Sequence, residues 1–308
     1  MYTHIADLPY KEYMHQIKGK IAGLLIGMIF FITLLNGCRK EVELSFNHQP
    51  KLCFNCILNP DSVIKADLSL SQAIGVAENF VPVTGAKIEL YENNQFYGVL
   101  NDNGYGNYSN NYHPQYGAEY KIRIQKDDYP TSEATTKVPD KTKIEYTTIL
   151  MDTTEQLYKK TVKIYDPKGK NQYWFYAYSI YGNQKYSGAT SNMYESFFDD
   201  FNKKQETESK YGFIYLYMVR FSDELCDGKV MQVNYWPRTL STMYTNFDKY
   251  MEVDTHYDKY LKTSVQALML KNEQIPMSEP LQIYSNVSNG YGIFGSCVMF
   301  TIIEYPIK

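Results

Sequence analysis

Residues 83–94 read VTGAKIELYENN, and this stretch indicates the fold class. The apolar residues Ala86, Ile88 and Leu90 alternate with more polar neighbours, so one face of an extended chain is apolar. The stretch ends in a pair of asparagines, which favours a tight hairpin turn. The pattern predicts a half-buried β-strand, and a mainly β protein wherever it recurs.

The same alternation recurs on both sides of this strand. Turn residues separate the alternating segments, as at 59–62 (NPDS) and 101–104 (NDNG). We expect residues 51–140 to form one β-rich domain. Its phrases GAKIELYENNQFYGVL, NGYGNY and GAEYKIRI resemble the small transthyretin-like or Ig-like β-sandwich, and this resemblance implies a module that presents surfaces and seldom carries chemistry.

A second β-rich domain is expected over residues 141–308. Residues 171–181 read NQYWFYAYSIY, with aromatic side chains on both alternating faces. Both faces therefore need a cover, which a second sheet, a helix or a ligand could supply. Residues 254–270 instead repeat apolar side chains at helical spacing, and Asp254 or Thr255 is placed to cap the helix. The predicted fold is an N-terminal transthyretin/Ig-like β-sandwich followed by a β-rich domain with one helix.

Composition supports β-structure and excludes several classes of protein. The 308 residues include 31 tyrosines, a residue that favours strands. A net charge of −3 gives no basis for nucleic-acid binding. With 44% hydrophobic and 21% charged residues, the chain is not disordered, collagenous, coiled-coil or a multi-span membrane protein.

The first forty residues predict the localisation of the protein. Residues 21–35 (IAGLLIGMIFFITLL) carry no charge and follow two lysines. A membrane-spanning helix needs about 20 apolar residues, so this stretch better fits the core of a secretory signal. It ends in LNGC at 35–38, which resembles the lipobox of bacterial lipoproteins.

The lipobox resemblance implies that Cys38 is lipidated and that residues 1–37 are removed as a signal peptide. Residues 38–50 then form a tether. The start codon is left open between Met1 and Met14. A cleaved signal with an incidental cysteine, or a short single-span anchor, is the alternative interpretation.

Residues 290–295 (GYGIFG) match the G-x-G-x-x-G string of dinucleotide sites. Such a site needs a helix that opens within the string and an acidic residue about 20 positions later. The residues after Gly295 read as a strand instead. We therefore expect a Gly-rich turn that feeds the last strand, and no nucleotide cofactor.

The cysteines give no strong sign of a metal site. Cys53 and Cys56 have the spacing of half a zinc site, but residues three apart on a strand point to opposite faces. Cys226 and Cys297 are single. Outside the cytoplasm the four thiols could form up to two disulfides, or they stay as buried free thiols.

No H-E-x-x-H, G-x-S-x-G or P-loop string occurs in the sequence, and no catalytic residue is predicted. The histidines after the lipobox are isolated in sequence: His48, His113 and His256. Adjacent carboxylates, expected in solvated loops, occur at Asp199-Asp200 and Asp223-Glu224. A candidate stacking platform for a sugar or peptide, with core packing as the competing interpretation, consists of Tyr173, Trp174, Tyr176 and Tyr178.

Several phrases in order resemble one family. They are the lipobox cysteine, VTGAKIELYENN, FSDELCDGK at 221–229, YDKYLKTSVQAL and YSNVSNGYGIFGS at 284–296. Together they resemble the Bacteroidota outer-membrane lipoproteins of the DUF-4249 type. The resemblance implies a lipid-anchored protein at the cell surface in the company of SusC-like TonB-dependent transporters. It brings no established catalytic residue and no cofactor.

The leading hypothesis is a non-enzymatic surface lipoprotein that binds substrate for, or stabilises, an outer-membrane complex with a TonB-dependent transporter. Its expected partners are the lipid bilayer, through acylated Cys38, and that transporter, with no nucleic acid. One alternative is a glycan- or peptide-acting hydrolase, which requires a close carboxylate pair in an aromatic cleft. The other is a structural subunit of a surface-protein export or assembly machine.

The substitution Cys38→Ser tests the lipid anchor. Acylation needs the thiol, so we expect the variant to keep residues 1–37 and to take up no radioactive palmitate. Labelling followed by gel electrophoresis measures both effects, and Cys53→Ser serves as the control that labels normally. Normal labelling of the Cys38→Ser variant would contradict the lipoprotein interpretation.

Overall fold

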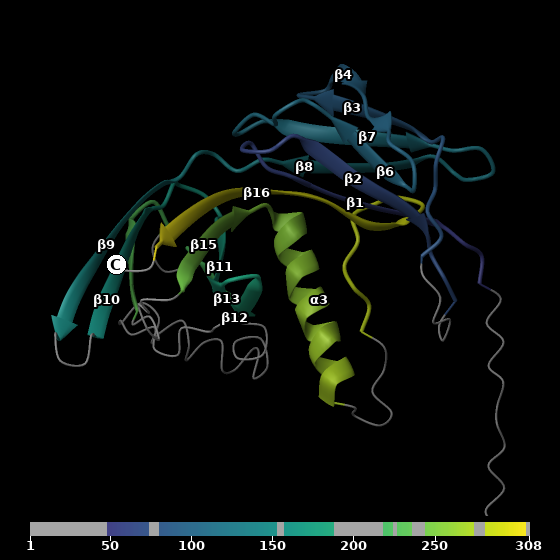
Figure 1. Cartoon of the computed structure of the whole chain (residues 1–308). Coiled ribbons are helices and arrows are strands. Elements are labelled where there is room, and N and C mark those ends of the chain that lie inside the picture. The colour runs from purple at the N-terminus through teal and green to yellow at the C-terminus, as the bar shows by residue number, and fades with distance from the viewer. Residues whose placement is uncertain are drawn as a thin grey trace, which may run out of the picture. The chain divides into compact units, whose positions relative to one another are not determined.

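The computed structural model describes residues 48–73, 80–152, 157–187, 218–223, 227–235, 244–273 and 281–305. Residues 48–308 make up one compact unit. The described residues contain sixteen strands in three sheets and one helix, so the predicted mainly β fold class is confirmed (Figure 1). The predictions for the signal peptide, Cys38 and most of the tether lie outside the described residues.

The largest sheet has nine strands in the order β12-β11-β15-β16-β1-β2-β6-β5, with β13 paired to β11. Its strands are β1 (Leu52–Leu58), β2 (Ile64–Leu70), β5 (Asn101–Asp102), β6 (Asn107–Asn110), β11 (Gln172–Tyr181), β12 (Gln184–Ser187), β13 (Met218–Ser222), β15 (Thr245–Val253) and β16 (Tyr291–Glu304). This sheet takes strands from both sides of the predicted domain boundary at 140/141. The division into two domains stays a prediction.

A four-stranded sheet, β4-β3-β7-β8, packs on the β1–β2 region of the large sheet. Its strands are β3 (Lys87–Glu92), β4 (Gln95–Val99), β7 (Glu119–Gln125) and β8 (Ser132–Lys137). The shared core includes Phe54 and Leu68 from one sheet and Ile88 and Ile122 from the other. The predicted strand, β3, ends in the predicted hairpin turn. Both residues of the asparagine pair, Asn93 and Asn94, have the positive φ that such a turn requires, 48° and 65°.

Both faces of β11 are covered, as its aromatic pattern predicts. On one face Tyr173 and Phe175 pack in a cluster with Val162 and Ile164 of a three-stranded sheet. That sheet has the order β14-β10-β9 and consists of β9 (Lys143–Asp152), β10 (Leu157–Tyr165) and β14 (Val230–Tyr235). On the other face Trp174 packs in a cluster with residues of helix α3 (Thr255–Glu273).

Helix α3 begins where the sequence predicts and continues three residues beyond the predicted end. Asp254 is its N-cap, because its carboxylate accepts hydrogen bonds from the backbone N–H groups of His256 and Tyr257 at 3.1 and 3.0 Å. Leu268, expected on the buried stripe, is 42% exposed. In the described part of the chain no helix is both long and apolar enough to span a bilayer.

The last strand differs from its prediction. Strand β16 begins at Tyr291 instead of Cys297, so Gly292 and Gly295 lie inside the strand and not in a turn. Residues 291–296 pair in parallel with β1, and residues 297–304 pair with β15. Gly292 has a φ of +106°, and a Cβ there would lie 2.0 Å from the carbonyl oxygen of Phe54. Glycine is therefore required at position 292, because the backbones of β16 and β1 approach each other closely there.

We expect Gly292→Ala to destabilise the protein by about 3 kcal/mol, because the added methyl group meets the β1 backbone and the φ is unfavourable for alanine. Urea unfolding measures the change in the free energy of unfolding. The matched control is Gly104→Ala, at a φ of +84° with nothing within 4 Å of the new Cβ. This control isolates the cost of the φ angle alone, about 1 kcal/mol. Equal losses in the two variants would contradict the close-approach explanation.

Candidate functional site

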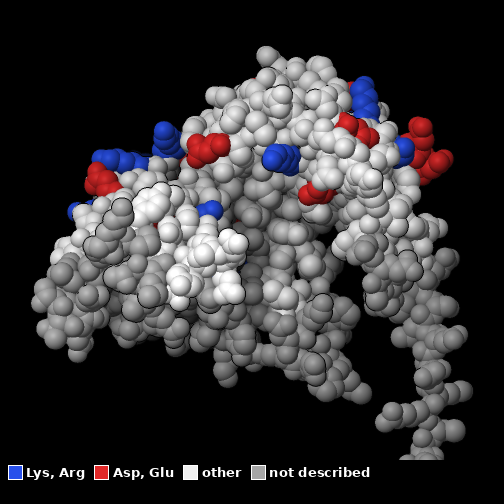
Figure 2. Space-filling model, viewed as in Figure 1, with Lys and Arg blue, Asp and Glu red and all other residues white. Residues whose placement is uncertain are grey.

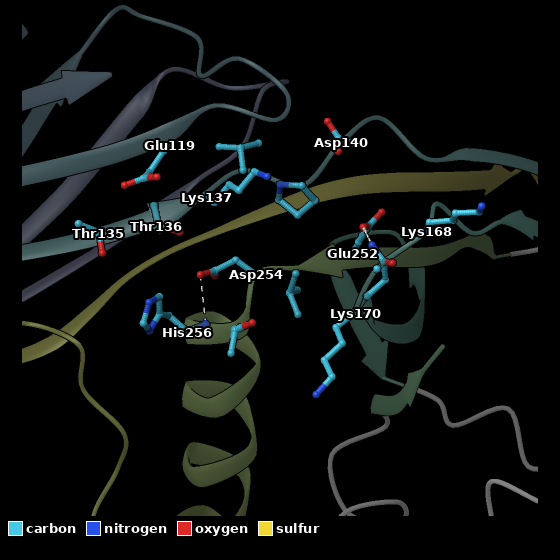
Figure 3. A pocket seen from close by; sticks show the side chains of 16 residues that line it. Glu119, Thr135, Thr136, Lys137, Asp140, Lys168, Lys170, Glu252, Asp254 and His256 are labelled. Atoms are coloured by element: carbon cyan, nitrogen blue, oxygen red, sulfur yellow. Dashed lines mark hydrogen bonds between the residues drawn. The ribbon is translucent and has the colours of Figure 1, made fainter. Parts of the chain in front are cut away.

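A polar cavity of about 410 Å³ is the candidate site (Figure 3). Its walls come from the end of β8 and the following residues to 140, the turn at 168–171, and the junction of β15 with α3. The lining includes Glu252, Asp254 and His256 together with three lysines. No tyrosine, tryptophan or phenylalanine is present among the described lining residues.

Glu252 is the buried carboxylate of this cavity, with an exposed fraction of 5%. Both oxygens accept a hydrogen bond: the Thr142 hydroxyl donates to Oε2, and Asn171 Nδ2 donates to Oε1 at 2.7 Å. Burial raises the pKa of Glu252, and the charge of Asp166 adds to this effect, while the two hydrogen bonds oppose it. The side chain therefore favours its neutral form more than an exposed glutamate does.

Asp254 links the cavity wall to strand β16. Besides capping α3, its Oδ1 accepts a hydrogen bond from the Ser296 N–H at 3.0 Å. Burial raises the pKa of Asp254, although three backbone N–H groups and the nearby His256 act in the opposite direction. Figure 3 shows the Asp254 carboxylate at the start of the helix, beside His256.

The three histidines named from the sequence have separate partners. His256 Nδ1 lies 2.7 Å from the Tyr284 hydroxyl, and only this histidine lines the cavity described above. His48 Nε2 lies 3.0 Å from the Ser71 carbonyl oxygen, and His113 Nδ1 lies 3.1 Å from the Pro60 carbonyl oxygen. These contacts support local structure and do not form a shared site.

Three carboxylates meet near the cavity. Asp166 follows β10, Asp223 follows β13, and Asp227 precedes β14, and each offers an oxygen within 4.8 Å of the others. Asp166 and Asp223 are buried, whereas Asp227 is exposed. Carboxylate oxygens of this kind are the ligands that Ca²⁺ and Mg²⁺ prefer.

Protein groups already satisfy much of this cluster. Asp166 accepts hydrogen bonds from the Tyr173 hydroxyl at 2.6 Å and the Gly228 N–H at 2.8 Å. Asp223 accepts one from the Asn171 N–H at 2.9 Å. Burial raises the pKa of both Asp166 and Asp223. The hydrogen bonds to each carboxylate oppose this effect, and the charges of the neighbouring aspartates add to it. The cluster therefore also holds in place the turn at 168–171, which forms one wall of the cavity.

Sequence reasoning identified only part of this cluster. The sequence places Asp223 and Glu224 together in a solvated loop or turn. In the structure Asp223 is buried, and Glu224 lies outside the described residues. Asp166 and Asp227 were not predicted. Each lies in a turn, at DPKG and DGK, so a turn signal was present, but nothing local shows that these turns meet.

The structure separates the four residues of the candidate aromatic platform. Tyr173 and Trp174 are buried, and their polar atoms bond Asp166 and Asp258, so they belong to the core and not to an exposed platform. Tyr176 and Tyr178 are half-buried and stack with ring centroids 6.2 Å apart. Tyr178 also stacks on Phe247 at 4.8 Å, and Lys185 Nζ lies 4.1 Å from its ring centroid. The remaining platform consists of Tyr176, Tyr178 and Phe247.

Three cysteines, Cys53, Cys56 and Cys297, are free thiols. Cys53 is partly exposed and Cys56 is buried, as expected for residues on opposite faces of β1. Burial raises the pKa of Cys56 and of Cys297 to about 12, and nearby aspartates add to the effect, so neither thiol is reactive near neutral pH. Cys226 and the pair Asp199-Asp200 lie outside the described residues.

The chain is thus a mainly β protein with a polar cavity whose carboxylates Glu252 and Asp254 accept hydrogen bonds from protein groups. It belongs to the family described as "Domain of unknown function (DUF4249)", whose profile matches residues 39–302. This match confirms the family predicted from the sequence phrases. No curated protein matches the chain.

We expect Glu252→Gln to reduce the pH dependence of stability. The folded-state pKa of Glu252 is raised, so as pH increases above about 4.5 the unfolded chain ionises first and the free energy of unfolding falls. Glutamine keeps the shape and can bond Asn171 and Thr142 without ionising. The variant should avoid about 1.4 kcal/mol of this loss for each unit by which the pKa is raised. Unfolding in urea at pH values from 4 to 8, in roughly unit steps, measures the effect.

Glu145→Gln is the control of opposite sign. Glu145 is exposed, and the hydrogen bond from Lys143 lowers its pKa, so any contribution to stability is lost as pH falls. Its substitution should leave the loss of stability towards neutral pH unchanged. A Glu252→Gln profile parallel to that of the unsubstituted protein would show that the buried carboxylate does not cause the pH dependence.

Proposed function

We propose that this chain is a lipid-anchored outer-membrane protein that assists a SusC-like TonB-dependent transporter and is not itself an enzyme. The observation that carries the proposal is the position of the family match. It begins at residue 39, directly after Cys38 of the lipobox-like sequence. A family match that begins directly after the acylation site is the arrangement expected of a protein tethered through its first residue.

The hydrogen bonding of the cavity supports a role in binding or assembly. Glycan hydrolysis needs one carboxyl group to donate a proton and a second to act as base or nucleophile. Glu252 instead has both oxygens bonded to protein donors, and Asp254 holds the start of α3. These structural roles weigh against the hydrolase alternative.

An exposed apolar sheet edge supports contact with a partner protein. Strand β4 is an edge of the four-stranded sheet, and it exposes 59% of Phe96 and 45% of Tyr97. Val99 on the same strand is also exposed. Edge strands with exposed apolar side chains readily pair with another chain unless something covers them. We assign the contact with the transporter to this edge.

The charges on the surface also favour an apolar contact. On the face shown in Figure 2, lysine and arginine side chains are interspersed with aspartate and glutamate. A face of mixed charge offers no extended patch of one sign to steer a charged partner. Shape and apolar contact would then determine specificity at the β4 edge.

Affinity purification of the tagged full-length chain from gently solubilised outer membranes tests the proposal. We expect a TonB-dependent transporter to be recovered in nearly equal amount, as quantified by mass spectrometry. Recovery of the protein alone would overturn the accessory role and make ligand and hydrolase screens the next step.

Two variants locate the contact within the same experiment. Phe96→Lys places a charge on the β4 edge, and we expect recovery of the transporter to fall at least tenfold, equivalent to about 1.4 kcal/mol. Ile149→Lys is the matched control, because Ile149 is 51% exposed on β9 and receives the same charge. Equal recovery with both variants would reject the β4 edge as the contact while leaving the accessory role intact.

A further inference from the structure

Three charged side chains meet between the three-stranded sheet and the large sheet. Lys160 of β10 is 2% exposed, and its Nζ lies 2.5 Å from Asp248 Oδ2 of β15. The same Nζ lies 2.6 Å from Glu304 Oε2 of β16. A lysine this deeply buried between two carboxylates is unusual and calls for an explanation.

The surroundings of this triad are apolar. Lys160, Val162 and Ile164 are the inward-facing positions of β10, so the lysine occupies the place of a core side chain. Tyr250 and Ile302 pack in the same cluster from the opposite sheet. Removing a lysine and two carboxylates from water is costly, and replacing such groups with apolar ones often stabilises a protein. Stability through ion pairing alone is therefore a weak reason to place them here.

We propose that Lys160 and Asp248 form a covalent isopeptide bond, promoted by Glu304. The three groups are those that amide formation requires: an amine, a carboxyl carbon, and a second carboxylate that carries protons. The contact distances place both carboxylates within direct reach of the Lys160 amine. The inference is independent of the function proposed above.

The reaction balances without any co-reactant. A proton first passes from the Lys160 ammonium to the Asp248 carboxylate, which leaves a neutral amine and a neutral acid. The amine lone pair attacks Cγ of Asp248, and the Glu304 carboxylate takes a proton from the attacking nitrogen. Glu304 then gives this proton to the departing hydroxyl group, the C–O bond breaks, and one water leaves. Glu304 ends as it began, so it acts as a general acid and base.

The geometry assigns different roles to the two acids. Asp248 accepts a hydrogen bond from Nζ, whereas Glu304 Oε2 is within ion-pair distance without hydrogen-bond alignment. The other oxygen of Glu304 accepts a hydrogen bond from the Thr148 hydroxyl at 3.0 Å, which orients the carboxylate. Asp248 is also the more buried of the two, with 6% of its side chain exposed against 16% for Glu304. Exclusion of water around Asp248 protects the amide from hydrolysis.

Mass spectrometry of the purified full-length chain tests the bond. We expect the denatured protein to be one water lighter than its calculated mass, in which removal of residues 1–37 and acylation of Cys38 are included where they occur. Trypsin should release a branched peptide that joins residues 160–163 to residues 239–249, because a modified Lys160 is no longer cleaved. A wild-type protein of full mass, or a lost water that maps elsewhere, such as the Asp227-Gly228 step, would overturn the proposal.

Variants separate the bond from simple burial. We expect Lys160→Arg and Asp248→Ala to abolish the branched peptide, and Glu304→Gln to reduce its yield at least tenfold while leaving both bonded residues in place. Lys163→Arg, on the exposed face of the same strand, is the matched control and should retain the bond. A full yield of branched peptide from Glu304→Gln would remove Glu304 from the proposed chemistry.

Discussion

The pairing of Asp254 with Ser296 holds three parts of the molecule in place. The Asp254 N–H donates to the Ser296 carbonyl oxygen, and the Ser296 N–H donates to the Asp254 carboxylate, both at 3.0 Å. The Ser296 hydroxyl in turn donates to the Lys137 carbonyl oxygen at 2.8 Å, which ties in the end of β8. Strand β16 exchanges β1 for β15 at this residue. The start of α3, the exchange of partners and the cavity wall therefore depend on one half-buried carboxylate. The cost of its partial burial is offset because its oxygens accept several hydrogen bonds.

The features that the sequence predicts well are those determined by a few adjacent residues. The strand at 86–91, its asparagine hairpin and the capped helix follow from local alternation, turn chemistry and helical spacing. The parallel pairing of β1 with β16 joins segments at opposite ends of the described chain, and no local pattern encodes it. Gly292 illustrates the difference: its sequence context indicates a turn, but its partner backbone at Phe54 makes it part of a strand.

The candidate site was harder to predict for the same reason. Asp166 and Asp227 are ordinary turn residues until the fold brings them beside Asp223. In β11 the sequence correctly predicts that both faces are covered, yet it does not distinguish a core aromatic from a ligand platform. Tyr173 and Trp174 differ from Tyr178 only in what packs over them, and the covering sheet and helix come from distant parts of the chain.

The position of β16 also determines when the large sheet can be completed. Strand β1 is synthesised long before its parallel neighbour β16, which is the last strand among the described residues. Before residues 291–304 emerge from the ribosome, β1 and β15 each lack the neighbour that separates them in the sheet. Closing the sheet is thus a late, slow event with high contact order. The nascent chain must be kept from pairing with other chains until β16 has been made.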